Sequence, residues 1–408
     1  MTIKPDPYLA LRIPDFRFFV GMRFFITLAL QIQGVVVAWQ VYALTHDPFS
    51  LGLIGLAEAI PAIVVALYAG HVADNFERKK VIVVSLFTLL CCSIGLFLIT
   101  FQSTGGLAVL LPIYVIIGLT GFARGFLGPA IFALMPQLIK KEDFSNAVTW
   151  NSTFWQTAAV VGPAAGGLIF GSLGLITTYS INIILIGAAF ILLLFIPNKP
   201  LPPKVSNTSL GESLKEGLSF VFKDQIILSA ISLDLFAVLF GGAVALLPIF
   251  ASDILLVGPM GLGFLRAAPS VGAVVMGGLV LFFPVKKHAG KILLASVAAF
   301  GGTMIGFGLS TSFYLSLFLL FLSGIFDAVS VIVRSTLIQT HTPEHLKGRV
   351  ASVNNIFIGS SNEIGSFESG LAAKIMGIVP SVIFGGSMTI LVVIITALKA
   401  KRLTKLHM

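Results

Sequence analysis

Residues 81–100 read VIVVSLFTLLCCSIGLFLIT, and residues 175–196 read LITTYSINIILIGAAFILLLFI. A helix rises about 1.5 Å per residue and needs about 20 apolar residues to cross a hydrocarbon core roughly 30 Å thick, which is the length of each stretch. Ten further segments of this kind follow one another along the chain. We therefore predict an all-α integral membrane protein with twelve spans, at 17–44, 50–73, 80–101, 107–134, 146–171, 175–196, 226–252, 258–284, 291–311, 313–338, 350–376 and 379–398.

The composition excludes several other classes of protein. Hydrophobic residues make up 57% of the chain and charged residues only 11%, far from the balance of a soluble domain. The net charge of +9 does not indicate nucleic-acid binding, because the basic residues lie in the loops between spans. The adjacent Cys91 and Cys92 form no disulfide or ligand pattern, and the six histidines lie in loops, at span ends or in the tail. We expect no metal and no cofactor.

The basic residues also set the expected orientation. Of the 26 lysines and arginines, 21 lie before the first span, after the last span, or in the loops that follow even-numbered spans. The opposite short loops, such as 45–50 and 102–106, contain none. Under the positive-inside rule, both termini are cytoplasmic. The first apolar stretch is too long for a cleavable signal, so we interpret it as the first span.

The chain divides into two halves of six spans. The longest internal polar stretch predicts a cytoplasmic linker at 197–225, between an N-terminal bundle at 1–196 and a C-terminal bundle at 226–408. A weak repeat with an offset of 203 to 207 residues relates Pro136, Asn151, Gly162 and Gly167 to Pro343, Asn354, Gly365 and Gly370. Paired six-helix bundles are typical of transporters that rock around a site near the bilayer midplane.

Charged residues inside the spans identify the helices that face the protein interior. The third, sixth, ninth and twelfth spans carry no charged residue in their interiors, and we expect them to be peripheral. Glu363 lies near the midplane in a polar run at 354–363, and Asp234 lies about a third of the way across. A carboxylate at that depth must be hydrated, paired or protonated, so proton carriage is chemically available there. Asp327 and Arg334 share a helix face and are equally compatible with a substrate cavity or with structural counter-ions.

Residues 70–80, GHVADNFERKK, resemble the signature loop of the major facilitator superfamily. The resemblance assigns this gate loop to Gly70, Asp74, Arg78 and Lys79, with Asp74 and Arg78 expected to latch the cytoplasmic side. Asn75 and Glu77 depart from the usual pattern. Residues 121–128, GFARGFLG, resemble a buried arginine motif of proton-coupled members, and residues 162–167, GPAAGG, resemble a packing motif of proton-exchanging exporters, at Gly162, Pro163, Gly166 and Gly167.

Four shorter stretches resemble one branch of that superfamily, which contains the enterobactin exporter and macrolide efflux proteins. They read SLDLF at 232–236, LRAAP at 265–269, PEHLKGRV at 343–350 and FIGSSNE at 357–363. The resemblance implies a proton antiporter in the bacterial inner membrane that exports a small amphipathic molecule, drug or siderophore by alternating access. We expect a monomer whose partners are this substrate, protons and the lipid bilayer.

These expectations assign roles to individual residues. For proton coupling we predict Glu363 and Asp234 first, and then Glu58 and Glu368. The predicted substrate cavity contains Gln31, Gln33, Arg124, Asp327 and Arg334. A transporter of lysophospholipid or another lipid-like substrate is the alternative. A receptor or scaffold would not need several buried charges, and no catalytic pairing or phosphate loop indicates an enzyme.

Overall fold

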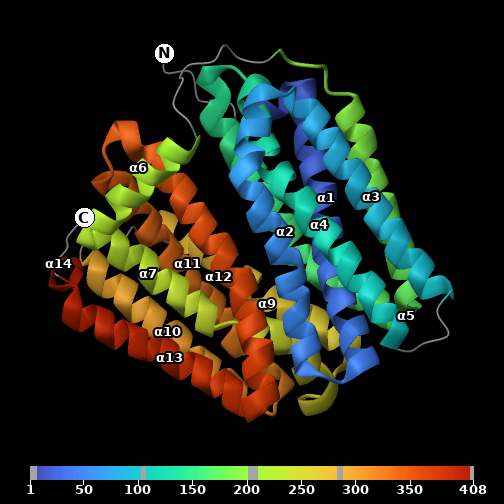
Figure 1. The fold of residues 1–408 in the computed structure, drawn as a ribbon, viewed down its shortest axis with the longest axis vertical. Coiled ribbons are helices and arrows are strands. Elements are labelled where there is room, and N and C mark those ends of the chain that lie inside the picture. The colour runs from blue at the N-terminus through green and yellow to red at the C-terminus, as the bar shows by residue number, and fades with distance from the viewer. Residues whose placement is uncertain (1–6, 103–106, 201–209, 283–287, 405–408) are drawn as a thin grey trace. The chain divides into compact units, whose positions relative to one another are not determined.

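The computed structural model describes residues 7–102, 107–200, 210–282 and 288–404, and every regular element among them is helical. The first half contains α1 (Pro14–Thr45), α2 (Pro48–Asn75), α3 (Arg78–Gln102), α4 (Leu110–Leu134) and α5 (Phe144–Leu194) (Figure 1). The second half contains α6 (Leu210–Lys223), α7 (Gln225–Phe240), α8 (Leu247–Ile249), α9 (Gly258–Phe282), α10 (Ala289–Leu309), α11 (Phe313–His341), α12 (Lys347–Met376), α13 (Ile378–Lys399) and α14 (Lys401–Thr404). Short helical turns extend several of these, including Ala243–Leu246 and a π-helical turn at Phe250–Ile254 that prolong α7.

The twelve predicted spans all correspond to helices. Within the described residues, ten helical stretches are long and apolar enough to cross a membrane. The 51-residue α5 holds two spans, because Gly174 interrupts it with φ 79° and ψ 177°. The 30-residue α12 is also long enough to cross, although it is more polar. The prediction of an all-α membrane protein is therefore confirmed, with helix ends within a few residues of those expected.

The chain forms two compact units. Unit 1 comprises 1–40 and 60–204, and unit 2 comprises 41–59 and 205–408. The second boundary falls inside the predicted linker. The end of α1 and the start of α2 belong to unit 2.

Unit 1 has a core of large side chains where α1, α3, α4 and α5 meet. Phe16 and Phe19 of α1, Leu86 of α3 and Leu193 of α5 are completely buried there. Between helices in lipid there is little hydrophobic driving force, so tight packing of such side chains supplies much of the attraction. This core fixes the positions of the polar side chains on the same helices.

Unit 2 is held together by small residues at helix crossings. A methyl group on Gly324 of α11 would come 1.8 Å from the carbonyl oxygen of Pro269 on α9, so the two backbones touch. Gly301 of α10 and Gly386 of α13 make a similar contact, and these two helices run side by side (Figure 1). Close backbone approach of this kind is the usual basis of helix association in membranes.

The predicted linker contains a helix, α6, that its polar sequence does not predict. One face of α6 packs Val221 against Ile227 of α7 and Val350 of α12, and Glu216 forms an ion pair with Arg349. At the following junction the Asp224 carboxylate accepts hydrogen bonds from two backbone N–H groups at the start of α7, as helix N-caps do. Although this stretch is polar in composition, it forms the helix α6, which packs on α7 and α12.

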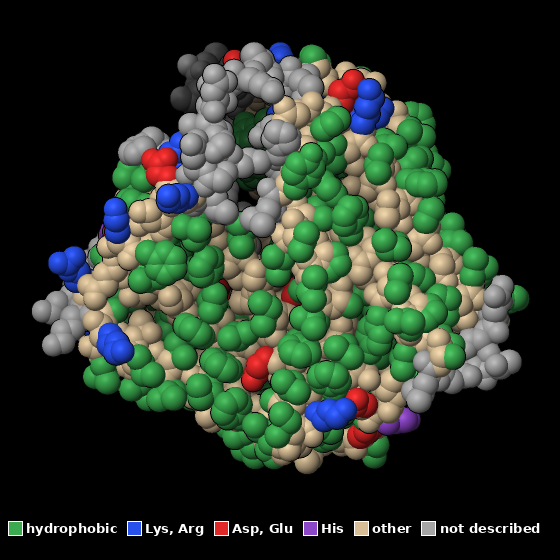
Figure 2. All heavy atoms as spheres, in the orientation of Figure 1, with side chains coloured by type: hydrophobic (Ala, Val, Ile, Leu, Met, Phe, Trp, Pro, Cys, Tyr) green, Lys and Arg blue, Asp and Glu red, His purple; other side chains and the backbone are tan. Residues whose placement is uncertain are grey.

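Hydrophobic side chains cover most of the visible face of each unit, and charged side chains occur in only a few places (Figure 2). Phe132, Tyr314 and Ile375 are each more than 70% exposed. Such side chains are unfavourable in water and suited to contact with lipid tails, in agreement with a multi-pass membrane protein.

Candidate functional site

A buried ion pair joins α7 to α11 in unit 2. The Asp234 carboxylate contacts the Arg334 guanidinium, and the two residues are only 5% and 2% exposed. At this burial the attraction offsets two desolvation penalties, and loss of either partner would leave an uncompensated charge. The structure thus brings together a predicted proton-coupling residue and a predicted cavity residue.

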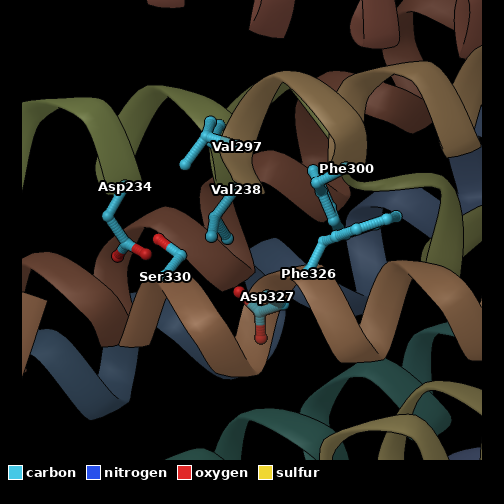
Figure 3. A pocket seen from close by; sticks show the side chains of 8 residues that line it. Asp234, Val238, Val297, Phe300, Phe326, Asp327 and Ser330 are labelled. Carbon is cyan, nitrogen blue, oxygen red and sulfur yellow. The ribbon is translucent and has the colours of Figure 1, made fainter. Parts of the chain in front are cut away.

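A small cavity lies beside Asp234, the acidic member of this ion pair (Figure 3). Asp234, Asp327 and Ser330 are its polar lining, and Val238, Phe300 and Phe326 are among its apolar residues. Its volume of about 10 Å³ is near the minimum for one water molecule and excludes an organic substrate. The Ser330 hydroxyl has no hydrogen-bond partner within the part of the chain that the structure describes. With both carboxylates ionised, Asp234, Asp327 and Arg334 together carry one net negative charge.

A second pair of opposite charges links α12 to α9. The Arg266 guanidinium lies near enough to the Glu363 carboxylate for the two to attract each other electrostatically. Gly55 of α2 lies on the same carboxylate: a methyl group there would come 3.7 Å from Glu363 Oε2 and 2.9 Å from the Glu363 carbonyl oxygen. Glu363 therefore sits where three helices of unit 2 meet.

The other two predicted proton-coupling carboxylates are half-buried. Glu58 lies one turn after Gly55 on α2, and one of its carboxylate oxygens is shielded from solvent. Glu368 lies on α12, five residues after Glu363. Both belong to unit 2, as Glu363 does.

In unit 1 the predicted cavity glutamines lie at helix contacts. The Gln33 carbonyl oxygen accepts a hydrogen bond from Asn182 of α5 at 3.0 Å, and the same amide group donates to Ser93 of α3. Gln31 lies against Gly162, where a methyl group would come 2.5 Å from its Cβ. These contacts hold both glutamines against α5. Arg124, the third member from this unit, is exposed on α4.

The GPAAGG motif of α5 packs on α1. Gly162, Pro163, Gly166 and Gly167 are all buried. A methyl group on Gly166 would come 3.1 Å from the Cα of Ile32. The contact therefore depends on the missing side chain, because any larger residue would push the two helices apart.

The basic residues of the gate loop bind the ends of other helices in unit 1. The Arg78 guanidinium donates a hydrogen bond to the Ala133 carbonyl at the end of α4, at 3.0 Å. The Lys79 ammonium donates to the carbonyls of Leu194 and Ile196 at the end of α5. Cations at helix C-termini pair with unsatisfied carbonyls and with the negative end of the helix dipole. Gly70 and Asp74 lie in the last turns of α2, and the Asp74 side chain is outside the described part of the chain.

One further polar contact crosses unit 1. The Arg23 guanidinium donates a hydrogen bond to the Asn151 side chain at 3.0 Å, which joins α1 to α5. This partner of Arg23 is one of the two asparagines of the internal repeat, which gives Asn151 a specific contact.

Comparison with known proteins identifies the family. The chain matches, over residues 6–407, the model of a family described as transmembrane secretion effectors. The chain belongs to this family, a branch of the major facilitator superfamily. Curated relatives of this chain include the enterobactin exporter of Shigella boydii serotype 18 and that of Escherichia coli O81. Each is 28% identical over 339 residues, which is 83% of this chain and 80% of the relative.

Solved structures agree on the fold. A POT family transporter in complex with 5-aminolevulinic acid gives a TM-score of 0.75 at 12% identity, with 96% of both chains covered. A bacterial homologue of the human lysosomal transporter Spinster gives 0.72 at 13% identity, with 98% of both chains covered. At these identities the likeness concerns the fold alone. The chain is a multi-pass membrane transporter for small molecules and not an enzyme.

The pairing of Glu363 with Arg266 was missed at the level of sequence. The sequence identified Glu363 as a charge within a span but assigned it no partner. Depth along the helices does not single out this contact: Arg266 is eight residues from the start of α9, whereas Glu363 is 13 and Glu368 is eight residues from the end of α12.

Proposed function

We propose that this chain is a secondary active exporter that moves a small amphipathic organic molecule, of the siderophore or drug class, in exchange for protons. Family membership in the secretion effectors supports outward transport. The relatives named as enterobactin exporters support a siderophore-like substrate. Alternating access of the two predicted six-helix halves would carry the substrate across.

The observation that supports proton coupling most directly is the charge arrangement in unit 2. Asp234 and Asp327 line one cavity, and with Arg334, the ion-pair partner of Asp234, they carry a net negative charge, while Glu363 attracts Arg266. A net charge inside a membrane-spanning region is costly. Binding of one proton to Asp234 or Asp327 would make the group of Asp234, Asp327 and Arg334 neutral. Substrate movement that alternately favours the neutral and the charged form would couple export to proton entry.

A transport assay tests this proposal. We expect purified protein in proteoliposomes, exposed to an imposed pH gradient, to accumulate enterobactin against its concentration gradient, and we expect collapse of the gradient with a protonophore to stop accumulation. Protein-free liposomes and a lysophospholipid probe are the controls. Transport of the lysophospholipid without transport of enterobactin or any drug probe would contradict the substrate class, and transport indifferent to the protonophore would contradict proton coupling.

The proposed orientation places both termini and the linker on the cytoplasmic side of a bacterial inner membrane. We expect cysteines at Ser206 and Ser50, each in a background with Cys91 and Cys92 replaced by serine, to label from opposite sides. An impermeant maleimide added to intact cells should therefore label Ser50→Cys and not Ser206→Cys. Labelling of both from outside would overturn the proposed topology.

A further inference from the structure

The end of α1 and the start of α2 lie against α12 in unit 2, and this contact has no room for side chains. A methyl group on Gly370 of α12 would come 2.7 Å from the Cα of Gly52 and 2.8 Å from the Pro48 carbonyl oxygen. A methyl group on Gly52 would come 3.0 Å from the carbonyl oxygen of Phe367. The two glycines therefore allow the backbones of α2 and α12 to touch.

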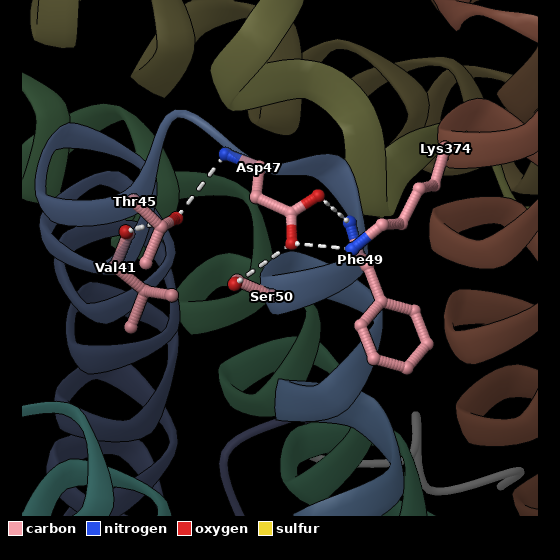
Figure 4. A network of polar contacts seen from close by, with 6 residues as sticks. All are labelled: Val41, Thr45, Asp47, Phe49, Ser50 and Lys374. Carbon is pink, nitrogen blue, oxygen red and sulfur yellow. Dashed lines mark hydrogen bonds and ion pairs between the residues drawn. The ribbon is translucent and has the colours of Figure 1, made fainter. Parts of the chain in front are cut away.

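An ion pair closes the outer end of the same contact, as Figure 4 shows. The Asp47 carboxylate lies 3.2 Å from the Lys374 ammonium, and it also accepts hydrogen bonds from the Phe49 N–H and the Ser50 hydroxyl at the start of α2. Lys374 lies 5.0 Å above the Phe49 ring, in a cation–π arrangement. Lys374 is the one basic residue that the predicted topology places at the outer end of a span. This unusual position is the feature of the sequence that indicates a specific contact for Lys374.

A further hydrogen bond ties the end of α1 to the end of the seventh span. The Tyr42 hydroxyl donates to the Asp253 carboxylate, which lies in the π-helical turn after α8. The ring of Phe49 also packs against that of Phe367, with 5.8 Å between ring centroids. Three contacts of different chemistry thus meet at one end of unit 2.

The contact continues inward to Glu363. Residues 363, 367, 370 and 374 follow one another at helical spacing along one face of α12. Asp47 and the first turns of α2, as far as Gly55, cover this face. Gly55 seats on Glu363, and a methyl group there would come 2.8 Å from Cβ of Ser366. The same interface that is closed at its outer end by Asp47 and Lys374 therefore covers the predicted proton carrier.

The exposure of these side chains distinguishes them from the buried ion pair of Asp234 and Arg334. The side chains of Asp47 and Lys374 are 31% and 52% exposed, and ion pairs with such exposure contribute little net stability. Asp234 and Arg334, in contrast, are almost fully buried. The exposed pair can form and break with little cost, as a contact that opens during a cycle requires.

We propose that these contacts form an outer gate that controls access to Glu363 from outside the cell. Its members are Tyr42, Asp47, Phe49, Gly52 and Gly55 on one side, and Asp253, Glu363, Phe367, Gly370 and Lys374 on the other. With the outer gate closed, α2 shields Glu363 from the outside. Separation of α2 from α12 exposes this carboxylate to outside protons, and Gly52, Gly55 and Gly370 make close closure possible. The inference rests on the proposed function in assigning proton carriage to Glu363.

Cysteine accessibility in right-side-out vesicles tests the outer gate without substrate or gradient. The sensor is Ser366→Cys, which lies beneath Gly55, in a background with Cys91 and Cys92 replaced by serine. We expect Gly370→Ala to raise the initial rate of labelling by an impermeant maleimide about tenfold or more, because the added methyl group separates the helices. Gly359→Ala is the matched control on the same helix, since a methyl group there meets no described atom within 4 Å; it should leave the rate unchanged.

The charged pair supplies an independent test in variants that keep the helix contact. We expect Asp47→Asn and Lys374→Gln each to raise the labelling rate by up to about fivefold. The double variant should label at the rate of Lys374→Gln, which removes both the ion pair and the contact with the Phe49 ring. Lys347→Gln, which removes a cation from the opposite end of α12, should have no effect.

Three results would overturn the outer gate: equal rates in all variants, additive effects of the two charge changes, or rapid labelling of the parent. The Asp47 and Lys374 variants decide the question if Gly370→Ala does not fold. Because accessibility needs no transport, a normal gate in a protein that moves no substrate would contradict only the proposed function.

Discussion

Replacement of Glu363 by glutamine is expected to abolish uphill export while exchange of substrate continues. Glutamine keeps the size and hydrogen-bonding capacity of the side chain but cannot alternate between a charged and a neutral form. If one proton exchanges for one neutral substrate, the wild-type protein can sustain a substrate gradient of roughly tenfold for each pH unit, and the variant none. Proteoliposome uptake with and without an imposed pH gradient measures uphill transport. Counterflow of labelled substrate measures exchange.

The matched control for this prediction is Glu344→Gln. Glu344 precedes the same helix, its side chain is 89% exposed, and its partner is Lys347 one turn away. Its loss should leave both transport modes unchanged. Wild-type uphill transport by Glu363→Gln, with an unaltered pH dependence, would eliminate Glu363 as the proton carrier and leave Asp234, Glu58 and Glu368 as the candidates.

Replacement of Arg334 by methionine is expected to destabilise the folded protein by about 3–5 kcal/mol, because Asp234 would remain buried without its partner and Asp327 would lie nearby with the same charge. The double variant Asp234→Asn with Arg334→Gln removes both charges and should recover most of this loss. We do not expect it to recover uphill transport, because the site would then keep only Asp327 as a carboxylate. Thermal unfolding of the purified protein and its monodisperse yield measure the stability.

The exposed pair of Lys347 and Glu344 again provides the comparison. Lys347→Gln should cost no more than about 1 kcal/mol, as is usual for surface ion pairs. A wild-type unfolding temperature in Arg334→Met, or a double variant as unstable as the single one, would show that Asp234 and Arg334 are not an energetically coupled buried pair.

The positions of the spans could be read from the sequence because the requirement for crossing a bilayer is local. An apolar run of sufficient length must be helical in lipid, since every backbone N–H and C=O group needs a partner within its own segment. The break between the fifth and sixth spans was equally local, at Gly174 with its positive φ. The linker was different: α6 is stabilised by Val221 packing on α7 and α12, which its own residues do not reveal.

The sequence also identified most of the charged residues of the candidate site, but not their partners. Asp234 and Glu363 were recognised by depth alone, because a charge in a span is rare and costly wherever it occurs. Their partners, Arg334 and Arg266, lie far along the chain on other helices. Gln33 illustrates the same gap, since its hydrogen bond to Asn182 depends on where the first and sixth spans meet.

By itself, then, the sequence determined that the chain is helical, that it crosses a membrane twelve times and which spans carry charges, because each of these follows from the composition of a single helix. The tertiary structure alone decided that Asp234 pairs with Arg334. It also decided that Lys374 pairs with Asp47 and that Gly55 covers Glu363. Contacts between helices depend on their rotation and crossing, which are set by side chains and glycines on both partners at once.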